Sequence, residues 1–259
     1  MLELLRKQGP FRHRNVRLYA WFTVLYNARA YYPVFAILFL DLGLTMQQFV
    51  LLNAFWATSI FLLEVPSGAL ADVIGRRKLV VAAAVLMVLE MLLLLLAPRD
   101  GGWLLFGMCV ANRILSGASE AAASGADQAL AVDTLAEHEE DHRWDETLAV
   151  VMKWRSAGYF IAMTIGALLY DRNILNAILP LQIEEGLALR LPLAMVFVQS
   201  LLCLACSLRM QEPGCHQEAE HTATRVRSAT KNTLAAAKWV LKTPLAFQVV
   251  LGGLPVSYT

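Results

Sequence analysis

Long apolar stretches separated by short polar ones dominate the chain. Residues 49–63, 156–170 and 191–208 contain no charged residue, and residues 79–97 contain one, Glu90. Runs of about 17–25 mostly apolar residues can cross a hydrocarbon core of roughly 30 Å as a helix. None of these runs alternates with the period of two that a membrane strand requires. Because a helix satisfies its own backbone polar groups in lipid, the pattern predicts an all-α protein that crosses the membrane several times.

Turn residues divide the apolar runs into six predicted spans, which form two three-helix repeats. The spans cover about 16–41, 47–67, 79–97, 103–135, 148–170 and 190–210. We expect Pro66 and Gly68 to close the second span, and Pro33 to kink the first. The predicted organisation is an N-terminal arm at 1–15, a six-helix domain at 16–210, a linker at 211–242 with a short amphipathic helix at 231–242, and an incomplete seventh span at 243–259.

The distribution of basic residues predicts the orientation in the membrane. Most of the 22 Lys and Arg residues fall on one side of the predicted topology. Arg99, Arg172 and Arg190 fall on the other side, and Arg29 and Arg113 lie within spans. Loops rich in Lys and Arg stay in the cytoplasm, so the N-terminus is predicted to be cytoplasmic.

Composition excludes several classes of function. The chain is 58% hydrophobic and 17% charged, against about 45–50% apolar and 25% charged for soluble domains. The net charge of +1 carries no information about nucleic-acid binding, and we expect no nucleic-acid partner. Cys203 and Cys206 form a C-x-x-C on an apolar helix, and His138 and His142 lie in an acidic loop that we interpret as solvated. With no phosphate-binding glycine loop and no catalytic constellation legible, we expect no enzyme, metal or cofactor.

Two charged motifs resemble those of a known family. Gly68-Ala-Leu-Ala-Asp72-Val-Ile-Gly75-Arg76-Arg77-Lys78, between spans two and three, resembles the signature loop of the major facilitator superfamily. Val73 stands where the family often has Arg. Arg113-Ile-Leu-Ser-Gly117 resembles the R-x-x-x-G of the family's fourth span. The resemblance implies the N-terminal six-helix half, with its linker, of a secondary transporter in the plasma membrane or bacterial inner membrane.

The resemblance also implies roles for the loop. Asp72 and Arg76 would bind neighbouring helix ends and hold the cytoplasmic gate closed. The alternative is that the basic loop only anchors the protein on the cytoplasmic side of the membrane. The gating candidates are Gly68, Asp72, Gly75, Arg76, Arg77 and Lys78. Span five has Gly158 and Gly166 but no proline, so a drug–proton antiporter is not implied, and these glycines are expected to permit close helix packing.

A charged stripe runs along the fourth span. Arg113, Glu120 and Asp127 follow one another at intervals of seven residues, or nearly two helical turns. Because a charge near the bilayer centre costs roughly 2.5–3.5 kcal/mol, such residues indicate function. Arg29 lies near the middle of span one and Glu90 near the middle of span three. We expect Arg29 to pair with Glu120, and Arg113 with Glu90 or Glu120.

In the family, spans one and four line the central cavity. The resulting cavity candidates are Arg29, Arg113, Glu120, Asn27 and Tyr26, with Asp127 and Asp133 supporting the cytoplasmic gate. Glu90 is expected to be structural, because span three should be peripheral. The alternative for Arg29 and Arg113 is a buried charge network that only orients the helices. Two basic residues at mid-depth favour an anionic or carboxylated substrate.

Two functional hypotheses follow. The first is half of a transporter that works by alternating access, with the lipid bilayer, a small-molecule substrate and protons as expected partners. A half-domain lacks an opposing wall, so we expect a truncated product that is inactive alone; dimerisation with a second copy and pairing with a missing C-terminal half are the alternatives. The second hypothesis is a non-transporting interaction or assembly subunit, which needs only a docking face.

Overall fold

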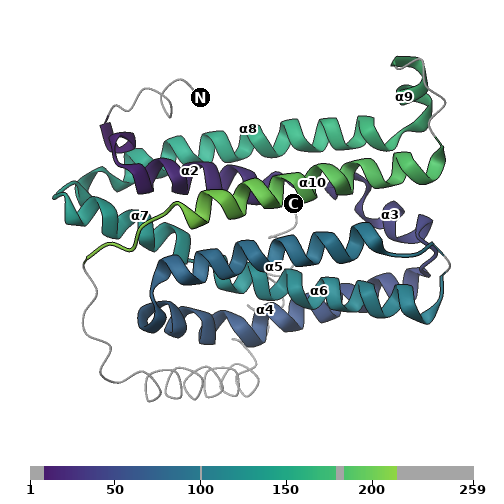
Figure 1. Cartoon of the computed structure of the whole chain (residues 1–259), viewed down its shortest axis with the longest axis horizontal. Helices are drawn as coiled ribbons and strands as arrows, with labels where there is room; N and C mark the ends of the chain where they lie inside the picture. The colour runs from purple at the N-terminus through teal and green to yellow at the C-terminus, as the bar shows by residue number, and fades with distance from the viewer. Residues whose placement is uncertain (1–8, 100, 179–183, 215–259) are drawn as a thin grey trace, which may run out of the picture.

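The computed structural model describes residues 9–99, 101–178 and 184–214, except the side chains of Ala69, Asp72 and Glu185. All regular secondary structure in these residues is helical (Figure 1). In chain order the helices are η1 (Gly9–Arg12), α2 (Arg14–Asn27), η2 (Tyr32–Val34), α3 (Phe35–Asp41), α4 (Met46–Ile74), α5 (Arg76–Leu96), α6 (Trp103–Ala123), α7 (Ala126–Glu137), η3 (Asp141–Arg143), α8 (Trp144–Tyr170), α9 (Arg172–Ile178) and α10 (Glu185–Leu208). The predicted helix at 231–242 and the predicted start of a seventh span at 243–259 lie outside the described residues.

The long helices form two layers that run along the same axis. One layer contains α2, α8 and α10, and the other contains α4, α5 and α6 (Figure 1). Helix α5 joins the layers because it packs against both α6 and α10. Helix α4 packs mainly on α6, whereas α8 packs on α2 and α10. The apolar core lies between the layers and includes Phe22, Leu38, Met87, Leu105 and Leu193, each fully buried.

The outer surface of the bundle suits lipid. Among the described residues, three helical stretches are long and apolar enough by themselves to cross a membrane: Met46–Gly68, Arg76–Leu96 and Gly186–Leu208. Helix α4 leaves Phe61 and Leu62 about three-fifths exposed. Apolar side chains exposed in rows along a helix are expected where acyl chains replace water. The protein is therefore an all-α membrane protein.

The first predicted span is broken in the middle. Helix α2 ends at Asn27, and the chain passes through a non-helical stretch before η2 and α3. Pro33 lies in η2, where its fixed φ suits a helix start. Gly166 of α8 lies against this break, because a Cβ atom there would be 1.7 Å from the carbonyl oxygen of Ala30. Gly158 likewise touches Val24, so the span-five glycines do permit close packing.

Two helix boundaries differ from those of the predicted spans. Helix α4 continues through Pro66 and Gly68 to Ile74, although its apolar stretch of membrane-spanning length ends at Gly68. A helix in a membrane protein tolerates an internal proline when neighbouring groups compensate. The fourth span is not continuous: α6 ends at Ala123 and α7 begins at Ala126. Gly125 separates them with a φ of +76°, a left-handed conformation that glycine adopts easily.

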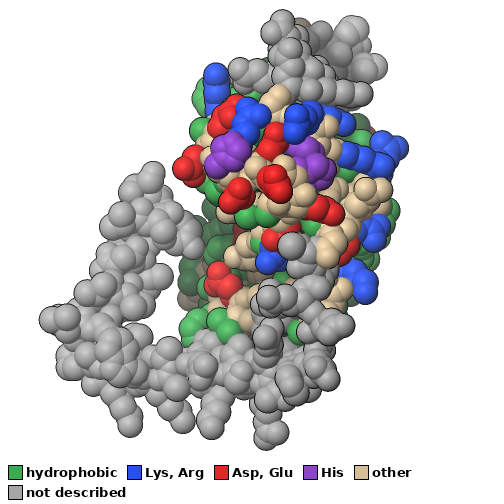
Figure 2. All heavy atoms as spheres, turned by 90° about the vertical axis from the view of Figure 1, so that its left-hand side faces the viewer, with side chains coloured by type: hydrophobic (Ala, Val, Ile, Leu, Met, Phe, Trp, Pro, Cys, Tyr) green, Lys and Arg blue, Asp and Glu red, His purple; other side chains and the backbone are tan. Residues whose placement is uncertain are grey.

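One end of the bundle concentrates ionisable side chains, and we call it the charged end. It comprises the start of α2, the α4–α5 junction, the α7–α8 connection and the end of α10. Figure 2 views it directly and shows acidic, basic and histidine side chains gathered there. The rings of His13 and His138 lie 4.1 Å apart between centroids. Arg12 and His13 both contact the Glu140 carboxylate, at 2.7 Å and 2.9 Å.

Candidate functional site

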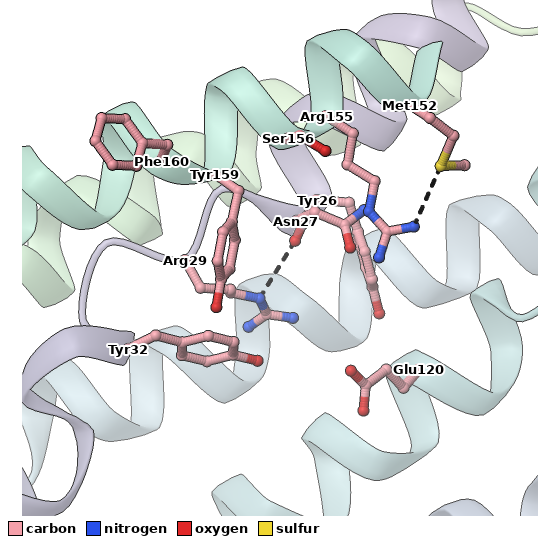
Figure 3. A pocket seen from close by; sticks show the side chains of 10 residues that line it. All are labelled: Tyr26, Asn27, Arg29, Tyr32, Glu120, Met152, Arg155, Ser156, Tyr159 and Phe160. Atoms are coloured by element: carbon pink, nitrogen blue, oxygen red, sulfur yellow. Dashed lines mark hydrogen bonds between the residues drawn. The ribbon is translucent and has the colours of Figure 1, made fainter. Parts of the chain in front are cut away.

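A groove runs along the side of the bundle between α4 and α8. Three adjoining cavities form it, with volumes of about 630, 430 and 350 Å³. Residues from α2, η2, α3, α4, α6, α7 and α8 line it, and Glu120 borders all three cavities. Figure 3 shows the largest cavity, with α8 on one side and Glu120 of α6 on the other. Ligand sites in proteins commonly have volumes of about 300–1,000 Å³, so the groove is large enough for a small molecule.

An ion pair forms part of the groove floor. Arg29, in the break after α2, pairs with the fully buried Glu90 of α5. The Nε atom of Arg29 also donates to the carbonyl of Tyr26, at 3.3 Å. The expected pairing of Arg29 with Glu120 is therefore wrong. Helix α5 contributes no residue to the lining of the three cavities; it packs against α6 and α10, and its Glu90 reaches Arg29 in the break.

Arg113 lies beside this pair without forming an ion pair among the described residues. Its Nε atom donates to Asn112 Oδ1 at 3.0 Å, and the Asn112 amide donates to the Glu90 carbonyl at 2.7 Å. The guanidinium carbon lies 5.0 Å from the ring centroid of Phe35 and 5.5 Å from that of Phe39. Such cation–π contacts stabilise a desolvated cation. The expected partners Glu90 and Glu120 are thus replaced by an amide and two rings.

Two buried polar atoms in the groove have no hydrogen-bond partner within the described part of the chain. One is Nη2 of Arg113, whose residue is only 4% exposed, and the other is Oε2 of Glu120. An unsatisfied buried polar group typically costs 1–3 kcal/mol, and more when it is charged. Both groups are therefore available to a ligand.

The other predicted cavity residues also border the groove. Asn27 lines two of the cavities and donates from its amide to the Thr23 carbonyl at 2.7 Å. Tyr26 lines the same two cavities, and its hydroxyl is 2.7 Å from Ser119 Oγ. The structure thus brings together all five predicted cavity residues on one surface.

Helix α8 contributes residues that the sequence analysis missed. Met152, Arg155, Ser156 and Tyr159 line the largest of the three cavities (Figure 3), and Met163 lines the neighbouring one. They recur at intervals of three or four residues, which places them on one face of a helix. The signal was present, because polar side chains on successive turns at the start of an apolar span indicate a face turned away from lipid. Trp56 of α4 is a further unpredicted lining residue.

At the charged end, Arg76 ties the α4–α5 junction to α7. Its guanidinium forms an ion pair with Asp133 and donates to the carbonyl of Ala129 at 2.8 Å. Asp127 instead borders the groove and accepts from the backbone N–H of Gln128 at 2.7 Å. The side chain of Asp72 is outside the described residues, so its pairing with Arg76 stays a prediction.

The same junction is tied to the end of α10. Arg77 donates to the carbonyls of Met210 and Leu208, at 2.6 Å and 3.0 Å. The Glu212 carboxylate accepts the backbone N–H groups of Arg76 and Arg77, at 2.9 Å and 3.0 Å. A carboxylate at a helix N-terminus satisfies free N–H groups and interacts favourably with the helix dipole. Glu212 therefore caps α5, a contact that the sequence analysis did not identify.

The remaining gating candidates have simpler roles. Gly75 has a φ of +103°, and a Cβ atom there would lie 2.9 Å from the Glu212 carboxylate. This position needs glycine for both its backbone conformation and its space. Gly68 lies inside α4 with open space around it, and Lys78 is exposed.

Helices with an apolar exterior and a charged internal groove define the class of α-helical membrane proteins with a polar cavity. Residues 19–254 match the model of the family described as Major Facilitator Superfamily, and the chain belongs to that family. Its members are membrane transporters of small molecules. A comparison with individual curated proteins finds no significant sequence match.

Proposed function

We propose that this chain forms one half of a secondary transporter, and that the groove is one wall of its substrate path. The observation that carries the proposal is that two charged residues of the groove, Arg113 and Glu120, each have a buried polar atom without a hydrogen-bond partner. Charges inside a bilayer face a water-filled path or another charge, because lipid cannot solvate them.

The open side of the groove indicates that a second protein wall covers it. Helices α4 and α8 border it, and polar side chains such as Asn53 and Ser156 lie along it. Such a surface is unfavourable against acyl chains. We propose that a second six-helix half covers it, either a C-terminal half or another copy of this chain. The two halves would rock about the groove and expose it to each side of the membrane in turn.

The charged end is the proposed cytoplasmic gate. Arg76 and Arg77 join the α4–α5 junction to α7 and to the end of α10. A network that holds three helix ends together can keep one side closed and release it when the helices move. Positive charge at this end supports its placement in the cytoplasm.

The substrate proposed for the groove carries a carboxylate. Arg29 is neutralised by Glu90, whereas Arg113 keeps an unpaired charge. Arginine binds carboxylates well because its planar fork matches their geometry. Protons are the first coupling ion to test, since Glu120 is a carboxylate in the same path.

Thiol labelling in proteoliposomes tests the proposal. In a background with serine at the four native cysteines, Asn53→Cys places a thiol in the groove. Leu51→Cys is its matched control, because Leu51 lies on the same helix and is 47% exposed on the outer surface. Maleimides react with thiolates in water, so we expect the thiol at position 53 to be labelled from both sides by an impermeant reagent, and the thiol at 51 from neither.

Two other results would count against the proposal. Labelling at position 53 from one side only would contradict alternating access and favour a non-transporting subunit. A lack of labelling at 53 from either side would contradict the water-filled groove itself.

A further inference from the structure

We propose that the groove takes a zwitterionic small molecule, with its carboxylate at Arg113 and its ammonium group at Glu120. This inference rests on the proposed function, because it names the substrate class of the same site. It requires that one cavity presents both charges, that neither charge is satisfied within the protein, and that no other charge unbalances them.

A single cavity holds both groups. The cavity of about 430 Å³ is lined by eight residues from η2, α3, α4, α6 and α8. Arg113 and Glu120 are the only charged residues among the eight, so the lining carries one positive and one negative charge. They lie seven residues apart on α6, which separates their backbones by about 10 Å at 1.5 Å per residue. A ligand that bridges them needs its two charges at opposite ends.

Neither charge is paired with an opposite charge within the described residues. No ion pair joins Arg113 to Glu120 in the described structure, and each has one buried atom without a hydrogen-bond partner. Arg113 is 4% exposed, so its guanidinium cannot turn into bulk water without a rearrangement. Two other cations lie along the groove: Arg29 is already paired with Glu90, and Arg155 lines the two neighbouring cavities but not this one. A ligand must therefore supply what both groups lack.

A ligand with one charge would satisfy only half of this site. A pure anion would pair with Arg113 but would bring negative charge towards Glu120. A pure cation would do the reverse. Burying a charge without a partner is unfavourable, and breaking a buried pair typically costs several kcal/mol. A molecule with both charges satisfies both residues and keeps the cavity neutral.

The side chains that line the cavity between Arg113 and Glu120 indicate the chemistry of the central part of the ligand. Tyr32, Phe35, Trp56 and Tyr159 line the cavity, and Asn53 adds one amide. The Tyr32 and Tyr159 rings lie 6.3 Å apart between centroids at an angle of 75°. Aromatic walls favour flat apolar groups through stacked or edge-to-face contacts. The expected ligand therefore has an aromatic or apolar centre.

Three probes of similar size test the inference by calorimetric titration of the full chain in lipid nanodiscs. The probe 4-(aminomethyl)benzoate carries both charges, 4-methylbenzoate only the carboxylate, and 4-methylbenzylamine only the ammonium group. Because a hydrogen bond to a charged group contributes about 1.5–3 kcal/mol, we expect the zwitterion to bind at least about tenfold more tightly than either other probe. This comparison uses the unmodified protein and so does not depend on the folding of a variant.

Two variants then assign the charges. Arg113→Gln should weaken the zwitterion about tenfold or more and should not weaken 4-methylbenzylamine, which gains from the loss of the like charge. Glu120→Gln should weaken the zwitterion similarly and should not weaken 4-methylbenzoate, for the same reason. Arg172→Gln is the control, because Arg172 is exposed on α9 and lines no part of the groove, and it should change nothing.

Equal binding of 4-methylbenzoate and the zwitterion, with no effect of Glu120→Gln, would overturn the inference and leave the proposed carboxylate path in place. No binding of any probe would also overturn it. The labelling of the thiol at position 53 would then show separately whether the proposed function survives.

Discussion

The guanidinium of Arg29 and the carboxylate of Glu90 form an ion pair that joins the break after α2 to the centre of α5. Both side chains are almost completely buried, at 3% and 0% residue exposure. The pair lies where the two helical layers meet. Arg29 lines the groove, and the buried pair also contributes to the packing of the bundle.

Removing one member of this pair should destabilise the protein strongly. Glu90→Gln leaves the Arg29 charge buried without a counter-charge, and we expect a loss of about 3–5 kcal/mol in the free energy of unfolding. The double variant Arg29→Met/Glu90→Met should lose much less, because it removes both charges together. Denaturant titration in detergent measures the difference. If the single and double variants lose equal stability, the pair is not coupled as described.

The contact between α8 and the break after α2 depends on the absence of a side chain at Gly166. Gly166→Ala would place a Cβ atom 1.7 Å from the Ala30 carbonyl oxygen, so the backbones must move apart. Overpacking of this kind costs about 1–3 kcal/mol. The matched control is Gly107→Ala in α6, where no atom lies within 4 Å and alanine should be neutral or stabilising. Thermal unfolding of both variants makes the comparison, and equal shifts would contradict the close approach.

The Glu212 cap should protect the start of α5. Glu212→Ala leaves the N–H groups of Arg76 and Arg77 without their acceptor, and loss of an N-terminal cap costs about 0.5–2 kcal/mol. Hydrogen exchange should therefore become faster at residues 76 and 77. Asp145→Ala provides a control, because Asp145 lies in the first turn of another long helix and is exposed. Unchanged exchange at 76 and 77 would show that the cap contributes nothing.

Glu140 should make stability depend on pH at the charged end. Its hydrogen bond with His13, aided by the charge of Arg12, holds the pKa of this carboxyl below its usual 4.5. A lowered pKa in the folded state stabilises the protein above pH 4.5 and loses that effect as the pH falls through the lowered value. Glu140→Gln removes the titrating group. We therefore expect the gap in melting temperature between the wild-type protein and this variant to narrow below pH 4.5, and a constant gap would contradict the effect.

Lys78 and Arg99 should lie on opposite sides of the membrane. Both are exposed and they flank α5 at its two ends. In inverted and right-side-out vesicles, Lys78→Cys should react with an impermeant maleimide only from the cytoplasmic side and Arg99→Cys only from the other. Reaction of both from the same side would contradict the topology.

Local patterns in the sequence determined the helical class, the approximate positions of the spans and the shared face of Arg113 and Glu120 on α6. Hydropathy and the 3.6-residue period act over one helix at a time, so they require no knowledge of its neighbours. For this reason Arg113 and Glu120 could be placed on one face before the fold was known. The loop motif also indicated the family to which the chain belongs.

Only the tertiary structure decided which charges meet. The expected Arg29–Glu120 pair became Arg29–Glu90 because α5 packs against α10 of the other layer and so brings Glu90 to the break. The depth of a residue in the membrane does not reveal its lateral neighbour. Tertiary packing also decided three other features: the contribution of α8 to the groove, the break after α2 and the Glu212 cap. Each depends on contacts between segments distant in the chain, and such contacts are selected by packing of the whole bundle, not by the residues of one helix.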